Sequence, residues 1–243
     1  ETSLPNVCQV QVGNNTGTNY AAYGRTALRQ DPDIIIYGEI RDPEVMLSAI
    51  DQANTGHLVL TTLHTNTPAD AIERLVSLGA NLTALTHSSL IRGIIGQRLI
   101  PRLCKKCKVK LVDAVNSSWS NEEHRRVYNY FRANHESTLD RVFTVNGAGS
   151  ECVECNNTGE KGRAPIVEII HVDNVGRSYI KKNDINGWLN HLRNRNWVDL
   201  KGKALRRIFD GQVCPLSTEL LIESPFGVSN DDFDYAEFED DSI

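Results

Sequence analysis

Residues 28–66 read LRQDPDIIIYGEIRDPEVMLSAIDQANTGHLVLTTLHTN, and this stretch decides the fold. It holds two short apolar runs, Ile34–Tyr37 and Leu58–Leu63, with a helical pattern between them. Strands that alternate with helices are typical of α/β folds with a parallel sheet. The first run leads to Glu39 and the second to His64. Because α/β folds place ligand chemistry at the carboxyl ends of parallel strands, we expect both side chains to belong to a functional site.

The helix between the two runs has clear start and stop signals. Asp42 is a favourable N-cap residue, and Pro43 suits the first helical position. Gly56 marks the exit. The apolar stripe between these signals consists of Met46, Leu47, Ile50 and Ala53. Thr67-Pro68 repeats the start signal, so we expect another helix that ends at Gly79.

The chain beyond this stretch contains weaker signals. We expect a helical run over Leu82–Leu99, which glycines interrupt. Ser120-x-x-Glu123 has the pattern of a capping box and predicts the start of an amphipathic helix. The apolar run Ile166–Ile170 indicates a strand, and a polar, helical region follows it to about residue 227.

Four of the six cysteines form two Cys-x-x-Cys pairs: Cys104, Cys107, Cys152 and Cys155. Each such turn points two thiolates at one centre, and two turns supply the four-sulfur shell of a closed structural zinc site. A redox dithiol and an iron–sulfur cluster are the alternatives. A redox motif needs only one pair, in a thioredoxin-like context that this sequence does not show. We therefore predict a structural Zn²⁺ that stabilises a small lobe.

Composition sets modest bounds. The 243 residues are 40% hydrophobic, which is enough for one large core or two small ones. The chain has no apolar run of the ~18–20 residues that a membrane span needs, and no secretory signal, so we expect it to be soluble. The net charge of −5 is smaller than the contribution of seven acidic residues within 231–241. The body is therefore close to neutral, and we expect the acidic tail to be disordered.

Several segments, taken in order, match one family. They are Arg29–Asp33 (RQDPD), Gly38–Asp42 (GEIRD), Thr55–Leu60 (TGHLVL), Leu63–Asn66 (LHTN) and Gln97–Leu99 (QRL), then the cysteine pairs and TGEKGR at 158–163. On these motifs the chain resembles the secretion ATPases that drive type II secretion and type IV pilus assembly. In that family the first two segments form the Walker B signature and the next two the His box. The cysteine pairs are similar to the metal-binding lobe of the type II secretion and pilus-extension branch.

The resemblance implies an α/β fold. We expect the C-terminal part of a RecA-like parallel-sheet ATPase core over residues 1–101 and a small tetracysteine zinc lobe over 102–165. A mixed, mainly helical C-terminal region is expected over 166–228, and the acidic disordered tail over 229–243.

The resemblance also implies roles for individual side chains. Glu39 is expected to hold Mg²⁺, and His64 to contact the γ-phosphate of ATP or the attacking water, which makes both candidate catalytic residues. Arg25 and Arg29, four apart on a predicted helix, are expected to approach ATP or a neighbouring subunit. The plainer alternatives are a solvent-exposed strand-end acid, a structural histidine and arginines in surface ion pairs.

One family element is missing from the sequence. No Gly-x-x-x-x-Gly-Lys-[Ser/Thr] phosphate-binding loop occurs in the 243 residues. From the order of motifs in the family we expect the chain to begin just after the acidic box that follows this loop. We therefore predict that the chain alone neither hydrolyses ATP nor binds it tightly.

The resemblance implies an intact enzyme that is a homo-oligomer, a hexamer. It is expected to be cytoplasmic and peripherally associated with the inner membrane, on the cytoplasmic face of a secretion or pilus platform. Two alternatives stay open: a zinc-containing nucleic-acid-binding module and a non-functional remnant. The body is near neutral, and its one basic cluster (Lys105, Lys106, Lys108 and Lys110) is too small for a groove, so no nucleic acid is expected as a partner.

Overall fold

The computed structural model describes residues 5–12, 20–87, 90–147 and 151–222. The chain divides into two compact units. The first is drawn from residues 1–95 and 169–197, and the second from residues 96–168 and 198–243. The acidic tail at 229–243, which the sequence predicts to be disordered, lies outside the described residues. The domain boundaries predicted at 101, 165 and 228 remain predictions.

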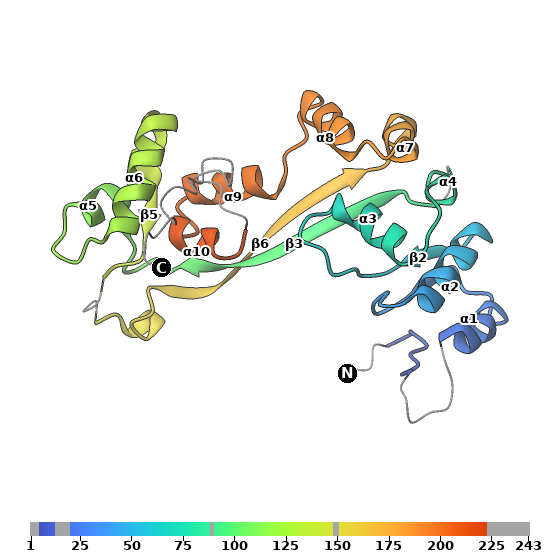
Figure 1. The fold of residues 1–243 in the computed structure, drawn as a ribbon. Helices are drawn as coiled ribbons and strands as arrows, with labels where there is room; N and C mark the ends of the chain where they lie inside the picture. Colours follow the sequence, from blue (N-terminus) through green and yellow to red (C-terminus); the bar gives the residue numbers. More distant parts are fainter. Residues whose placement is uncertain (1–4, 13–19, 88–89, 148–150, 223–243) are drawn as a thin grey trace, which may run out of the picture. The chain divides into compact units, whose positions relative to one another are not determined.

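The first unit contains a β-α-β arrangement (Figure 1). Its elements are α1 (Tyr20–Leu28), β1 (Ile34–Ile36), α2 (Pro43–Asn54), β2 (Leu58–Leu60), α3 (Asp70–Ser77), α4 (Leu82–Leu85), α7 (Asn174–Lys181) and α8 (Ile185–Asn194). Strands β1 and β2 pair in parallel, with Ile35 opposite Val59. The Asp42 side chain accepts a hydrogen bond of 2.9 Å from the Val45 N–H, which confirms the predicted N-cap of α2.

Two apolar clusters support this unit. The inner face of the β1–β2 pair, through Ile35 and Val59, packs on buried residues of α2 and of the segment around α4. The core of this cluster consists of Tyr37, Ile40, Val45, Met46, Ala49, Leu78, Ala80 and Leu85. The other cluster lies around the fully buried Trp188 of α8 and includes Ile72 of α3. Burying apolar side chains in this way supplies the main free energy that fixes β1 and β2.

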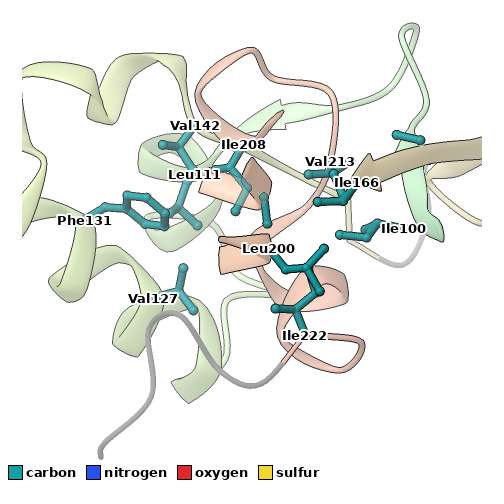
Figure 2. Close-up of a cluster of buried hydrophobic side chains, with 12 residues drawn as sticks. Ile100, Leu111, Val127, Phe131, Val142, Ile166, Leu200, Ile208, Val213 and Ile222 are labelled. Carbon is teal, nitrogen blue, oxygen red and sulfur yellow. The ribbon is translucent and has the colours of Figure 1, made fainter. Parts of the chain in front are cut away.

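The second unit has its own core, which Figure 2 shows. Its elements are β4 (Val109–Lys110), α5 (Leu111–Val115), α6 (Glu122–Asn134), η1 (Glu136–Arg141), β5 (Phe143–Thr144), η2 (Val153–Cys155), α9 (Leu200–Phe209) and α10 (Pro215–Glu219). Strands β4 and β5 are antiparallel. Phe131 of α6, Leu111 of α5 and Ile208 of α9 are fully buried in the shared cluster.

The long strands β3 (Gly93–Leu103) and β6 (Glu160–His171) pair with each other and contribute residues to both units. Strand β6 confirms and extends the strand predicted at Ile166–Ile170. The helical run predicted over Leu82–Leu99 is wrong beyond Leu85, because β3 begins at Gly93. Exposure alternates residue by residue along the first part of β3. Glycines and β-branched isoleucines favour this two-residue period over a helical one.

The start of α6 also differs from the prediction. Asn121, and not Ser120, is the N-cap residue, and its side chain accepts a 2.9 Å hydrogen bond from the His124 N–H. Asparagine is at least as good an N-cap residue as serine, so the helix begins one residue later than the capping-box pattern indicates. Within the part of the chain that the structure describes, no helix is both long and apolar enough to cross a membrane.

Candidate functional site

The carboxyl ends of β1 and β2 are held together beyond the strands themselves. The Tyr37 N–H donates to the Leu60 carbonyl at 2.9 Å, and the Ile40 N–H donates to the Thr62 carbonyl at 3.1 Å. The Thr62 hydroxyl donates to the Gly38 carbonyl at 2.6 Å. Parallel strands bring their carboxyl ends to the same edge of a sheet, so these bonds place Glu39 and His64 beside each other.

Glu39 and His64, both predicted site residues, are in contact. The His64 Nε2 lies 3.2 Å from the Glu39 Oε1, and the Arg41 Nε lies 2.6 Å from the Glu39 Oε2. The contact between Arg41 and Glu39 is one that sequence reasoning missed, although their separation of two residues around a strand end was a signal for it. Chemically, the group is a carboxylate flanked by a guanidinium and an imidazole, three groups able to hold a cation and a phosphate.

The two predicted arginines lie elsewhere in the same unit. Arg25 is on α1, and Arg29 lies in the turn just after this helix ends at Leu28. The sequence predicts one helix that carries both arginines, but the helix in the structure ends one residue too early for this. Both side chains are exposed. Among the described residues, neither arginine forms an ion pair with Glu39, so the structure brings together one half of the predicted nucleotide site.

Arg25 borders a shallow groove between α1 and α2 with a volume of about 300 Å³. Its lining comprises Gly24, Arg25, Leu28, Glu44, Leu47, Ser48, Asp51 and Gln52. The helices approach closely at Gly24, where a side-chain carbon would lie 2.6 Å from the Ser48 hydroxyl. The groove is separate in its lining from the Glu39 and His64 pair.

The four predicted cysteines converge, and this confirms the expected cluster. Their four Sγ atoms all lie within 4.8 Å of one another, with 3.9 Å between Cys104 and Cys152 and 3.6 Å between Cys107 and Cys155. Tetrahedral zinc–thiolate bonds of ~2.3 Å require sulfur–sulfur distances of about 3.8 Å. The arrangement therefore fits a zinc ion, and it leaves no position for a substrate.

The protein environment prepares the cluster for a cation. The Gly159 N–H donates to the Cys155 Sγ at 3.3 Å, and the Gly159 carbonyl accepts from the Cys104 N–H at 2.8 Å. Burial opposes ionisation of the Cys155 thiol, yet the Gly159 N–H and the other thiols outweigh it and lower its pKa to about 7. Burial and hydrogen bonds to the other cysteines raise the pKa of Cys107 to about 12. Four thiolates this close need a bound cation to ionise together.

Lysine side chains next to the two cysteine pairs form ion pairs and hydrogen bonds with neighbouring segments. Lys161 and Lys106 both form ion pairs with Glu154, which lies between the second pair of cysteines. The Lys108 ammonium donates to the Gly211 carbonyl at 2.7 Å and lies 4.1 Å from the centre of the Phe143 ring. These contacts anchor the loop of the first cysteine pair to the turn that follows α9 and to β5.

The chain is similar in sequence to known proteins. A family model described as "Type II/IV secretion system protein" matches residues 1–221. The chain is 38% identical over 180 residues to a type IV pilus assembly ATPase, PilB, of Thermus thermophilus, covering 74% of this chain and 19% of that protein. It is 33% identical over 175 residues to the type II secretion system ATPase E of Vibrio cholerae, covering 72% and 31% respectively. The chain thus spans about a fifth to a third of the length of these two relatives.

Two solved structures share the fold. The pilus retraction motor PilT with bound ADP matches with a TM-score of 0.53 and 23% identity, and the match covers 93% of this chain and 46% of that chain. The ATPase DotB of Legionella pneumophila matches with a TM-score of 0.53 and 21% identity, covering 83% of this chain. These likenesses confirm the predicted α/β fold with a RecA-like core. The converging cysteines and the helices of the second unit agree with the rest of that prediction.

Proposed function

The chain belongs to the type II/IV secretion system protein family, and we propose that it forms the magnesium-holding and phosphate-sensing part of an ATPase that powers type II secretion or type IV pilus assembly. The observation that carries this proposal is the 3.2 Å approach of His64 to Glu39 at the ends of two parallel strands. A cation-binding carboxylate beside a phosphate-binding imidazole is a suitable arrangement for Mg²⁺-dependent phosphoryl transfer.

We assign the role of magnesium ligand to Glu39. The backbone on both sides of Glu39 is held at the strand end by the hydrogen bonds of Tyr37 and Ile40 to the neighbouring chain segment, and the Glu39 side chain is only 19% exposed. When Mg²⁺ is bound, it neutralises the charge that develops on transferred phosphate. Glu39 holds the cation directly or through water, because Mg²⁺ retains several waters when protein carboxylates bind it.

We assign the response to phosphate to His64. Its side chain is 85% exposed and reaches past the end of β2 while contacting Glu39. An imidazole in this position donates a hydrogen bond to a γ-phosphate oxygen or orients the attacking water. Leu63, the neighbour of His64, packs against the apolar cluster around α2, and this packing is the proposed route by which a change at His64 would reach α2.

Arg25 and Arg29 have a different role from Glu39 and His64 in this proposal. Both are exposed and lie away from Glu39, on and just after α1. Guanidinium groups suit bidentate phosphate contacts and action across a subunit boundary. We assign them to contacts with nucleotide or with a neighbouring subunit of a homo-oligomer, a hexamer in the intact enzyme.

The tetracysteine cluster has a structural role in the proposal. Cys104, Cys107, Cys152 and Cys155 hold one Zn²⁺, which joins two chain segments that are far apart in sequence. A closed four-sulfur shell stabilises a fold and does not activate substrate. The enzyme would work at the cytoplasmic face of an inner-membrane secretion or pilus platform, peripherally associated with the membrane, and without nucleic acid as a partner.

A hybrid enzyme tests the proposed function. The 180 aligned residues of the Thermus thermophilus pilus assembly ATPase would be replaced by those of this chain. The proposal expects ATP turnover that Glu39→Gln lowers by about a hundredfold or more, the scale seen for single groups that stabilise a charged transition state. Glu73→Gln removes one exposed carboxylate from α3 of the same unit and is the matched control. Turnover by a folded hybrid that Glu39→Gln leaves intact would contradict the proposal.

A further inference from the structure

Arg41 contacts the Glu39 carboxylate, and the proposed function gives this arginine no role. Its Nε contacts the Glu39 Oε2 at 2.6 Å, while His64 faces the other oxygen of the same carboxylate. The Arg41 side chain is 78% exposed, four times as much as that of Glu39 at 19%. The anion is therefore held by the fold, and its guanidinium partner extends into solvent.

The backbone on both sides of Arg41 is fixed. Ile40 is buried and its N–H donates to the Thr62 carbonyl. Asp42 caps α2 through the Val45 N–H. Release of Glu39 by Arg41 thus needs only a rotation of the Arg41 side chain, and leaves the strand end and the helix start in place.

A divalent cation and Arg41 compete for the same carboxylate. The guanidinium nitrogen at 2.6 Å from Oε2 uses one lone pair of that oxygen and obstructs the approach of an inner-shell Mg²⁺, and the two positive charges repel each other. Exposed ion pairs contribute little free energy because water and salt compete for both partners. A divalent cation is therefore able to displace the guanidinium.

We propose that Arg41 is a positioning residue for Glu39 that occupies the carboxylate in the metal-free chain and is displaced when a divalent cation binds. This inference rests on the proposed magnesium role of Glu39. It assigns one net effect to Arg41: by holding the carboxylate of the metal-free chain, it weakens cation binding there by direct competition. Arg41 would thereby limit cation binding to conditions in which a second ligand, such as a nucleotide phosphate, adds to the affinity.

Mn²⁺ is the probe for this competition. The zinc-loaded chain would be titrated with Mn²⁺, and paramagnetic broadening of the His64 imidazole resonances would report binding beside Glu39. Four variants are compared with the native chain: Arg41→Gln, Arg41→Lys, Glu39→Gln and the control Arg74→Gln. Because the broadening falls steeply with distance but extends beyond direct contact, only the part of it that Glu39→Gln removes is assigned to Mn²⁺ bound at Glu39.

The expected result is tighter Mn²⁺ binding in Arg41→Gln by about threefold to fivefold, the scale of an exposed ion pair. Arg41→Lys, which keeps a charge but loses the planar Nε contact, is expected to lie between Arg41→Gln and the native chain. Arg74→Gln should match the native chain, and Glu39→Gln should abolish the broadening.

Two outcomes separate failure of the inference from failure of the proposed function. Glu39-dependent broadening with the same midpoint in Arg41→Gln and Arg74→Gln, or weaker binding in Arg41→Gln, would overturn the role of Arg41 alone. Absence of His64 broadening in both the native chain and Arg41→Gln would overturn the magnesium role of Glu39, and the inference with it.

Discussion

His64 and Glu39 lie 3.2 Å apart, although one follows β2 and the other follows β1. Their approach depends on the in-register parallel pairing of Ile34 with Leu58 and Ile36 with Leu60. The pairing continues through Thr62, whose hydroxyl donates to the Gly38 carbonyl. One short parallel strand pair therefore brings the Glu39 carboxylate and the His64 imidazole together.

The isolated chain is expected to have no detectable ATP turnover in the presence of Mg²⁺. The phosphate-binding loop that supplies backbone and lysine contacts to phosphate does not occur in its sequence. A coupled assay for released phosphate, at saturating ATP and with the zinc-loaded chain, measures this. Turnover that disappears in Glu39→Gln would contradict the prediction, because it would place a complete catalytic site within these residues.

One zinc ion per chain is expected from elemental analysis of protein purified in reducing, chelator-free buffer. Cys155→Ser should lose this zinc and destabilise the second unit, because structural zinc binding is coupled to folding. Cys8→Ser is the matched control, since Cys8 is exposed and lies outside the cluster. Metal-free native protein with an unchanged melting temperature would exclude the structural zinc.

Asp42→Ala should lower the free energy of unfolding of the first unit by about 1 kcal/mol, the usual effect of removing an N-cap acceptor. Asp42→Asn retains a side-chain oxygen for the Val45 N–H and should retain most of this stability. Urea unfolding of the two variants measures the difference. Equal losses in both variants would show that the charge of Asp42, and not its hydrogen bond, stabilises α2.

His124 should make the stability of the chain fall in mild acid. Burial lowers the pKa of this imidazole, and the nearby charge of Glu123 opposes this shift only in part. The unfolded chain then takes up a proton near pH 6.5, whereas the folded chain takes it up only at lower pH. Stability from the neutral imidazole is therefore present above the unfolded pKa and is lost as pH falls below it.

Urea unfolding at pH 7.5 and 5.5 tests this dependence. His124→Gln should reduce the loss of stability between the two pH values, and His171→Gln, at an exposed position, should not. Comparison between variants removes the contribution of the cysteines, which all of them share. An identical pH dependence in native protein and His124→Gln would contradict the assignment.

Sequence patterns predicted the features that depend on local chemistry or on paired motifs. The Asp42 cap, the two strands and the convergence of four cysteines all follow from short-range rules. The helical run predicted beyond Leu85 failed because the pairing of β3 with β6, which are far apart in sequence, overrides local helical spacing. The contact of Arg41 with Glu39 was missed because the two-residue spacing allows it but does not fix the side-chain directions at a strand end.

A double-mutant cycle on turnover by the hybrid enzyme tests the central claim that Glu39 and His64 serve one nucleotide site. Glu39→Gln and His64→Gln are each expected to lower ATP turnover. Because both groups act on the same bound phosphate, the double variant should be no slower than Glu39→Gln alone. Losses that multiply in the double variant, or a His64→Gln hybrid as fast as its parent, would contradict the claim.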